Sequence, residues 1–185
     1  MIRIVGITGT NGAGKGTAVN FLVRKMGFKH YSVRDFLIDE INRRGLIVNR
    51  DTMNFVANDL RKKYYPSYIV ETLYKKAKAE GGNSVIESIR TTGEVESLRS
   101  KGDFILISID APVEERYKRI ILRDSETDRI SFEEFIENEK KEMISDDPAE
   151  QNLFKCMELS DYKLYNDGSI EDLEKKIADI FNCLR

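Results

Sequence analysis

The stretch GITGTNGAGKGTAVNFL, residues 6–22, decides the fold that we expect for this chain. It overlaps the apolar run IRIVGIT, residues 2–8, which has the pattern of a buried β-strand, and it ends in a helical pattern. Glycines between the two let the backbone turn with its N–H groups facing inward, and Lys15 adds a positive charge at the start of the helix. The stretch therefore predicts a loop that binds polyphosphate. We expect the phosphates to be held by Asn11, Gly12, Ala13, Gly14, Lys15, Gly16 and Thr17.

The residue after Lys15 departs from the general pattern of such loops. That pattern has Ser or Thr directly after the lysine, and its hydroxyl coordinates Mg²⁺. Here Gly16 follows Lys15, and the hydroxyl comes one place later, at Thr17. We therefore expect Mg²⁺ to be held mainly by water and by the nucleotide's phosphates, with Thr17 as a metal-site residue.

Length, charge and cysteine content limit the possible partners. The 185 residues suit one compact domain, and 30 basic against 32 acidic residues leave a net charge of -2. We expect no nucleic-acid or membrane partner, because this charge creates no attracting field and no apolar stretch approaches the roughly 20 residues of a membrane span. Cys156 and Cys183 lack metal-ligand spacing, which indicates free thiols. An apolar run already begins at Ile2, which leaves no room for a charged leader, so we expect a cytoplasmic protein. We also expect a monomer or homodimer.

Short apolar runs alternate with helical patterns along the chain. This alternation predicts an α/β fold of three layers, α/β/α, with a five-stranded parallel sheet between helices. Ser169, with Asp172 three residues on, is expected to cap the last helix, and Ser131 with Glu134 to cap a helix in the charged segment 123–147. The expected strands cover residues 2–8, 28–31, 84–87, 104–109 and 162–165.

Some fifty residues of helical pattern, 32–80, separate the second and third expected strands. That insertion is too long for a plain crossover helix. We expect a single domain over 1–185, with this insertion and the segment 123–147 added to a core. The core consists of residues 1–31, 81–122 and 148–185.

The loop, in the form GxxGxGKGT, resembles that of adenylate kinase and related nucleoside monophosphate kinases. Further segments resemble archaeal adenylate-kinase-related proteins, phage deoxynucleoside monophosphate kinases and dephospho-coenzyme A kinases. The resemblance implies a P-loop NTPase fold that binds ATP and Mg²⁺, with 32–80 as an acceptor-binding insertion and 123–147 as a small lid. The segments are YSVRDFL (31–37), VANDLRKKY (56–64), VIESIRTTGEVESLR (85–99) and LSDYKLYNDGSIEDL (159–173).

The same resemblance suggests residues for the acceptor. Arg90, just beyond a buried strand, resembles the arginine that binds the acceptor's phosphate. Asp35 matches an aspartate of the adenylate kinases, but Arg34 replaces their glycine, and Ile38 stands where their phosphate-gripping arginine would be. We assign Arg34, Asp35 and Arg90 to acceptor binding, and the general alternative for Arg90 is a surface ion pair. Asn58 and Arg61, one helical turn apart, either line the acceptor pocket or belong to an exposed face.

On the donor side, Glu87 ends a strand where relatives often have an aspartate that orients magnesium through water. Asp110 is a rival for that role, and we favour Glu87. Arg116, Arg119 and Arg123 recur at helical spacing, so they form a basic edge directed towards 123–147. In the kinases a lid delivers such arginines to the transferring phosphate, which suggests Arg119, Arg123 and also Arg129. The turn NDGS, 166–169, resembles a loop that touches adenine, and this assigns Asn166 and Gly168 to ATP.

Three functions follow from these assignments. The first is transfer of the γ-phosphoryl group of ATP to a nucleoside or deoxynucleoside monophosphate, with Lys15, Arg90, Arg119 and Arg123 as catalytic residues; an ionised acceptor needs no general base. The second is a dephospho-coenzyme A kinase, whose hydroxyl acceptor needs a carboxylate base, for which Asp35 is the candidate. The third is an ATP-binding switch or assembly factor with little transfer. We expect His30, the single histidine, to be a half-buried residue at a strand end rather than a base.

Overall fold

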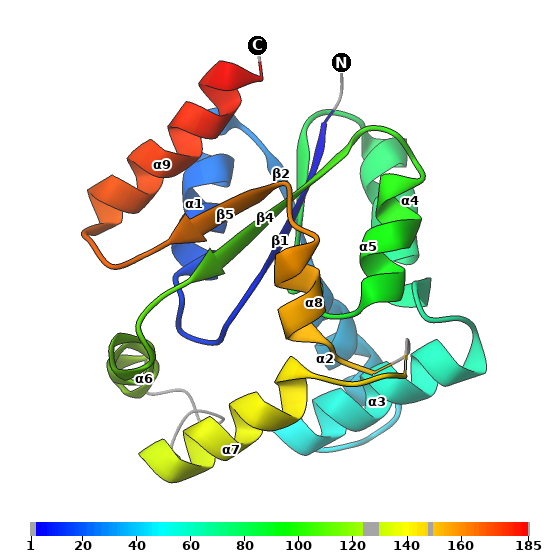
Figure 1. Ribbon diagram of the computed structural model, residues 1–185. Coiled ribbons are helices and arrows are strands. Elements are labelled where there is room, and N and C mark those ends of the chain that lie inside the picture. The colour runs from blue at the N-terminus through cyan, green and yellow to red at the C-terminus, as the bar shows by residue number, and fades with distance from the viewer. Residues whose placement is uncertain (1–2, 124–129, 148–149, 185) are drawn as a thin grey trace.

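The computed structural model describes residues 3–123, 130–147 and 150–184, and it contains a five-stranded sheet in the order β2-β3-β1-β4-β5 (Figure 1). All four pairings are parallel, so the predicted fold class is confirmed. The strands deviate from the predicted ranges by no more than a residue or two at an end. They are β1 (Ile4–Gly9), β2 (Lys29–Ser32), β3 (Ser84–Glu87), β4 (Phe104–Asp110) and β5 (Tyr162–Tyr165).

Both faces of the sheet are covered, which explains the continuous apolar pattern of its central strand. All six residues of β1 are buried, since this strand has a neighbour on each side and helices above and below. On one face Val5 and Ile7 pack with α1 (Lys15–Met26) and α9 (Ile170–Cys183). On the other face Ile4, Ile86 and Leu106 pack with residues of α4 (Tyr68–Glu80), α5 (Thr92–Arg99) and α8 (Leu153–Glu158) (Figure 1).

The insertion after β2 is helical, as predicted for residues 32–80. It forms α2 (Val33–Arg43) and α3 (Arg50–Lys63) and then continues into α4. A helix after β4, α6 (Val113–Leu122), leads towards α7 (Phe132–Met143). Figure 1 shows α3 and α7 beyond the ends of the strands, away from the chain termini.

Local capping fixes the ends of several helices. The predicted capping boxes are present: Ser169 caps α9 with Asp172, and Ser131 caps α7 with Glu134. The serine oxygen accepts a backbone N–H in the first turn, which would otherwise lack a partner within the helix. None of the described helices combines the length and hydrophobicity that crossing a bilayer requires. Cys156 and Cys183 are free thiols, as expected.

Two glycines at and after the end of β1 are required for steric reasons. Gly9 has φ +132°, and a Cβ there would lie 1.9 Å from the carbonyl oxygen of Ile109 in β4. Gly12 has φ +80°, and its Cβ would lie 2.4 Å from the carbonyl oxygen of Arg116 in α6. The loop can therefore press against the neighbouring strand and helix only without side chains at these two positions.

Gly9→Ala should lower the free energy of unfolding by about 3 kcal/mol or more, because the new methyl group collides with backbone and the φ angle is strained. Gly16→Ala is the matched control, since nothing lies within 4 Å of its ideal Cβ and the residue is inside α1. That substitution should be neutral or slightly stabilising. Urea denaturation of both variants measures the difference; equal stability of the two would contradict the steric account.

Candidate functional site

The loop between β1 and α1 surrounds the end of the Lys15 side chain. The Lys15 ammonium donates to the carbonyl oxygens of Gly9, at 2.8 Å, and Thr10, at 2.7 Å. Burial and the nearby Arg90 guanidinium lower the pKa of Lys15 to about 7, and the Glu87 carboxylate opposes this shift only in part. An anion entering the loop would reverse both effects, because it favours the protonated amine.

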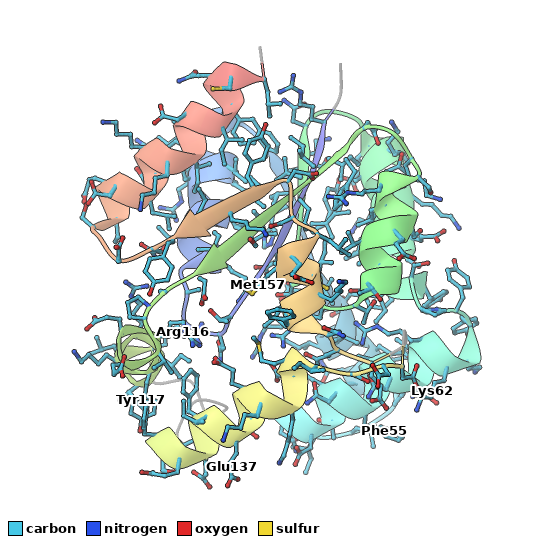
Figure 2. All side chains as sticks on the ribbon, in the orientation of Figure 1. Phe55, Lys62, Arg116, Tyr117, Glu137 and Met157 are labelled. Atoms are coloured by element: carbon cyan, nitrogen blue, oxygen red, sulfur yellow. The ribbon has the colours of Figure 1, made fainter. Side chains whose placement is uncertain are left out.

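Three neighbouring segments fix the shape of this loop. Thr10 donates from its hydroxyl to Asp110 at 2.6 Å, and Asn166 donates from its side chain to the carbonyl of Ala13 at 2.8 Å. Arg116, on α6, donates to the carbonyl of Asn11 at 3.3 Å (Figure 2). The loop is therefore positioned by β4, α6 and the turn after β5, all of which follow it by about 100 residues or more.

A single cavity of about 900 Å³ connects the loop with the helical insertion. It is lined on one side by the loop and by the turn before α9. Its other side is lined by α2, α3 and the segment after β3. Of the predicted phosphate-binding residues, Ala13 is buried below the cavity, whereas the other six line it. The lining residues with predicted roles are Asn11, Gly12, Gly14, Lys15, Gly16, Thr17, Arg34, Arg61, Glu87, Arg90, Arg119, Arg123, Asn166 and Gly168.

The three arginines of α6 have different surroundings. Arg116 is 5% exposed, donates to the Ala111 carbonyl and forms a bidentate ion pair with Glu139 of α7, so its contacts are structural. Arg119 donates through Nη2 to the carbonyl of Asn166 at 3.2 Å, while its buried Nη1 has no hydrogen-bond partner. Arg123 reaches the side chain of Asn11 at 3.3 Å. Arg119 and Arg123 thus face the cavity, and the suggested Arg129 lies outside the described residues.

Glu87 and Asp110, the two candidates for orienting magnesium, are used differently. Asp110 accepts from Thr10 and from the Ala111 amide and does not line the cavity. Glu87 lines it, accepts from Ser32 at 3.1 Å and pairs with His30 at 3.4 Å. Burial opposes ionisation of Glu87, but His30, Ser32 and Lys15 outweigh it and lower the pKa of the carboxyl. His30 is therefore partner to this carboxylate at the end of β2, and the contact raises the pKa of His30.

The residues fit a magnesium ion bound next to phosphate. Thr17 and Glu87, predicted for this metal, both line the cavity, and Glu87 is close enough to Lys15 for their charges to interact. One or two oxygen ligands from protein are usual where Mg²⁺ takes its other ligands from water and phosphates.

Arg90 lines the same cavity as Lys15 and is not a surface ion pair. Its Nη1 donates to Glu142 of α7, at 2.6 Å, and to Gln151, at 2.7 Å. Glu142 also accepts from Arg50, the first residue of α3, at 2.5 Å. Sequence reasoning missed Arg50 and Glu142, because nothing local shows that positions 92 residues apart meet.

Two other residues predicted to bind the acceptor do not line the large cavity. Asp35 is exposed in the first turn of α2, where Ser32 caps its backbone N–H, and it does not line the cavity. Asn58 borders a smaller hollow of about 290 Å³ and has a buried side-chain oxygen without a hydrogen-bond partner. Neither residue lines the large cavity, although the smaller hollow beside Asn58 shares Arg50, Asn54, Glu142 and Gln151 with it. The assignments of Asp35 and Asn58 to acceptor binding stay predictions.

Arg61, by contrast, is 2% exposed and does not belong to an exposed helix face. It forms an ion pair of 2.8 Å with Glu94, which is fully buried. The second carboxylate oxygen of Glu94 accepts the backbone N–H of Arg90, at 2.9 Å, and of Thr91, at 3.2 Å. Glu94 thus ties the helical insertion to the segment that carries Arg90.

Ser88 is a further residue that sequence reasoning missed. It lines the cavity after β3 with φ +66°, the one positive φ of a residue other than glycine in the described part of the chain. The next residue, Ile89, is fixed through its carbonyl, which accepts from Thr8 at 2.7 Å. Such backbone strain is typical of functional sites, and no sequence pattern marks it here.

Comparison with known proteins places the chain among two overlapping groups. A family model described as an AAA domain matches residues 8–137. The UPF0200 protein of Pyrobaculum aerophilum is 30% identical over 187 residues, covering all of both chains. The UPF0200/UPF0201 protein of Archaeoglobus fulgidus is 30% identical over 184 residues, which cover 97% of this chain and only 55% of that protein's length.

Solved structures of kinases share the fold. The crystal structure of shikimate kinase from Aquifex aeolicus superposes with a TM-score of 0.55 at 18% identity, covering 97% of this chain and 96% of that one. At this identity the likeness concerns the fold alone: a P-loop kinase fold.

Glu94→Gln should lower the free energy of unfolding by about 3–5 kcal/mol, because it leaves the Arg61 charge buried without a counter-charge. Adding Arg61→Met to Glu94→Gln should recover much of that loss, because it removes the unpaired charge while the new amide oxygen can still accept the backbone N–H groups of Arg90 and Thr91. Glu115→Gln, which breaks an exposed pair with Lys118, is the control and should cause no measurable change. Urea denaturation provides the values; a Glu94→Gln variant as stable as the control would disprove the buried ion pair.

Proposed function

The chain belongs to the AAA-domain family and to the UPF0200 proteins, and from that premise we propose that it is an ATP-dependent phosphotransferase. Its acceptor in this proposal is a nucleoside or deoxynucleoside monophosphate, which receives the γ-phosphoryl group. Only this small-molecule partner is proposed, for a cytoplasmic monomer or homodimer.

The observation that carries the proposal is the continuous cavity lined by several cationic groups. Lys15, Arg119 and Arg123, which line it, face the donor in this proposal, and Arg34 and Arg90, which also line it, face the acceptor. Transfer between two phosphates brings together two anions, and the main task of the protein is to neutralise and align them. A phosphate acceptor is already ionised, so this arrangement requires no general base.

Each donor-side residue has a role in this proposal. The amides of residues 11–17 hold the phosphates, and Lys15 reaches the outer two. The unpartnered Nη1 of Arg119 provides a buried donor for the transferring group, with Arg123 beside it. Asn166 and Gly168 contact the adenine. Magnesium, when bound, neutralises phosphate charge, and Thr17 and Glu87 hold it, Glu87 through water.

The alternatives have less support at the site. A dephospho-coenzyme A kinase needs a carboxylate base, and Asp35, the candidate for this role, is exposed outside the cavity. Glu87 and Glu142, the two carboxylates among the described lining residues, are both engaged by basic side chains. The alternative that is not a phosphotransferase is a nucleotide-dependent switch. It would hydrolyse ATP at a rate that no acceptor changes.

The proposal is tested by coupling ADP release to a panel of acceptors. The panel contains ribo- and deoxyribonucleoside monophosphates, dephospho-coenzyme A and shikimate, the last as a hydroxyl acceptor. We expect at least one monophosphate to stimulate ADP release and to yield the diphosphate. Stimulation by a hydroxyl acceptor alone, or steady hydrolysis that no acceptor changes, would refute it.

Lys15→Ala should lower turnover by roughly 10²–10³-fold, because it removes a charge positioned for the transferring phosphate. The fold should be unaffected, since the loop is fixed by Thr10, Asn166 and Arg116. ADP release gives the rate, and circular dichroism with thermal melting checks the fold. Lys25→Ala, an exposed lysine near the end of the same helix, is the matched control. Near-normal activity of Lys15→Ala would contradict the assignment.

ATP binding should take up a proton above pH 7. The pKa of Lys15 is about 7 in the free protein, and the phosphates raise it, so at pH 8 most molecules must protonate this amine on binding. Affinity should therefore decrease as the pH rises from 7 towards 9. Calorimetry at pH 8 in two buffers with different ionisation enthalpies measures the uptake, and Lys15→Arg, which does not titrate here, should bind without it. Proton-free binding to the unmodified protein would disprove the linkage.

A further inference from the structure

The Glu142 carboxylate lies between the guanidinium groups of Arg50 and Arg90 inside the cavity. Glu142 is 7% exposed, and its two oxygens lie 2.5 Å from Arg50 and 2.6 Å from Arg90. All three residues line the cavity, and the charges of Arg90 and Glu142 also act on Lys15 in the phosphate loop. The carboxylate therefore fills a ready-made anion site inside the cavity where the acceptor must bind.

The charges at this site do not balance. Burial alone would raise the pKa of Glu142, but Arg90 and Arg50 outweigh it and lower the pKa, so the group is a monoanion near neutral pH. Two guanidinium groups face this one negative charge, and the other direct partner of Arg90 is the neutral Gln151. Arg50 also stands at the N-terminus of α3, where the helix dipole adds positive potential. A phosphate monoester dianion would neutralise the arginine pair fully, which a carboxylate cannot.

A second contact would hold α7 in place if a phosphate took the position of the Glu142 carboxylate between the two arginines. Glu139 precedes Glu142 by three residues and forms the bidentate pair with Arg116 of α6. Phe135, one turn earlier, is buried and packs against the same guanidinium. The C-terminal part of α7 can therefore release its carboxylate while the middle of the helix remains attached.

We propose that Arg50, Arg90 and Gln151 form the subsite for the phosphate of the acceptor, and that Glu142 is an internal competitor which this phosphate displaces. The inference rests on the proposed phosphotransferase function, and it adds Arg50 as a binding residue and Glu142 as a determinant of acceptor affinity. Binding of the dianion expels one carboxylate and loosens the end of α7. Glu142 thereby selects for a phosphate dianion over a ligand carboxylate. A dianion that replaces Glu142 adds one negative charge between the two arginines, whereas a ligand carboxylate only replaces one monoanion with another.

The affinity test uses inorganic phosphate as the probe and Lys15→Ala as the background, so that the phosphate loop contributes little. Adding Glu142→Gln should tighten phosphate binding by about tenfold or more, as expected when a competitor that occupies most molecules is removed. Further adding Arg50→Ala should abolish that gain. Glu137→Gln is the matched control, because it removes the same charge from an exposed position on the same helix, and it should change nothing (Figure 2). Unchanged or weaker binding in the Glu142→Gln variant would overturn the proposal.

A second measurement needs no variant and no turnover. Hydrogen exchange of the unmodified protein should become faster at the amides of residues 140–144 when phosphate is added, while the amides near Glu139 and Phe135 remain protected. Unchanged or slower exchange at residues 140–144 would show that Glu142 is a fixed structural partner. Because neither readout involves ATP, failure here is distinct from failure of the phosphotransferase proposal, which the acceptor screen decides.

Discussion

The structure depends on the close approach of the loop after β1 to its neighbours. β1 is the central strand, and its last residue, Gly9, lies so near the β4 backbone that a methyl group would be 1.9 Å from the Ile109 carbonyl. Gly12 has the same relation to α6. This contact allows Asp110, Arg116 and Asn166 to hold the loop from three sides. The loop amides and Lys15 are therefore fixed in position before any ligand arrives, which is the condition for electrostatic stabilisation at low reorganisation cost.

The basic side chains around the cavity differ in their hydrogen-bond and ion-pair partners. Arg116 pairs with the half-buried Glu139 and Arg61 with the fully buried Glu94, and both arginines connect elements of the fold. Lys15 donates to two carbonyl oxygens, and Arg119 and Arg61 each keep one buried Nη1 without a hydrogen-bond partner among the described residues. Arg50 and Arg90 share a single carboxylate. Lys15, Arg50, Arg90 and Arg119 line the cavity with positive charge that carboxylates balance incompletely, and an anionic ligand would stabilise them.

Sequence reasoning succeeded where the signal was local. The strands, the two capping boxes and the phosphate loop depend on periodicity and on residues three to eight positions apart. Of the two candidates for orienting magnesium, Glu87 lines the cavity and Asp110 does not, and the metal role of Glu87 stays a prediction. Asp35 is exposed and does not line the cavity, so its predicted role in acceptor binding stays a prediction. Sequence reasoning missed the pairing of Arg50 with Glu142, which depends on where α7 crosses the cavity. The ion pair of Arg61 with Glu94 likewise joins residues 33 positions apart.

The central claim, a rigid ring of loop amides that holds a triphosphate, is tested most directly by amide NMR. The ¹⁵N-labelled protein would be titrated with a magnesium complex of a non-hydrolysable ATP analogue. The account predicts that the largest shift changes fall on the amides of residues 11–17, with smaller ones at Asn166 and Gly168. Saturable binding with no change in residues 11–17, or no binding at millimolar analogue, would contradict it.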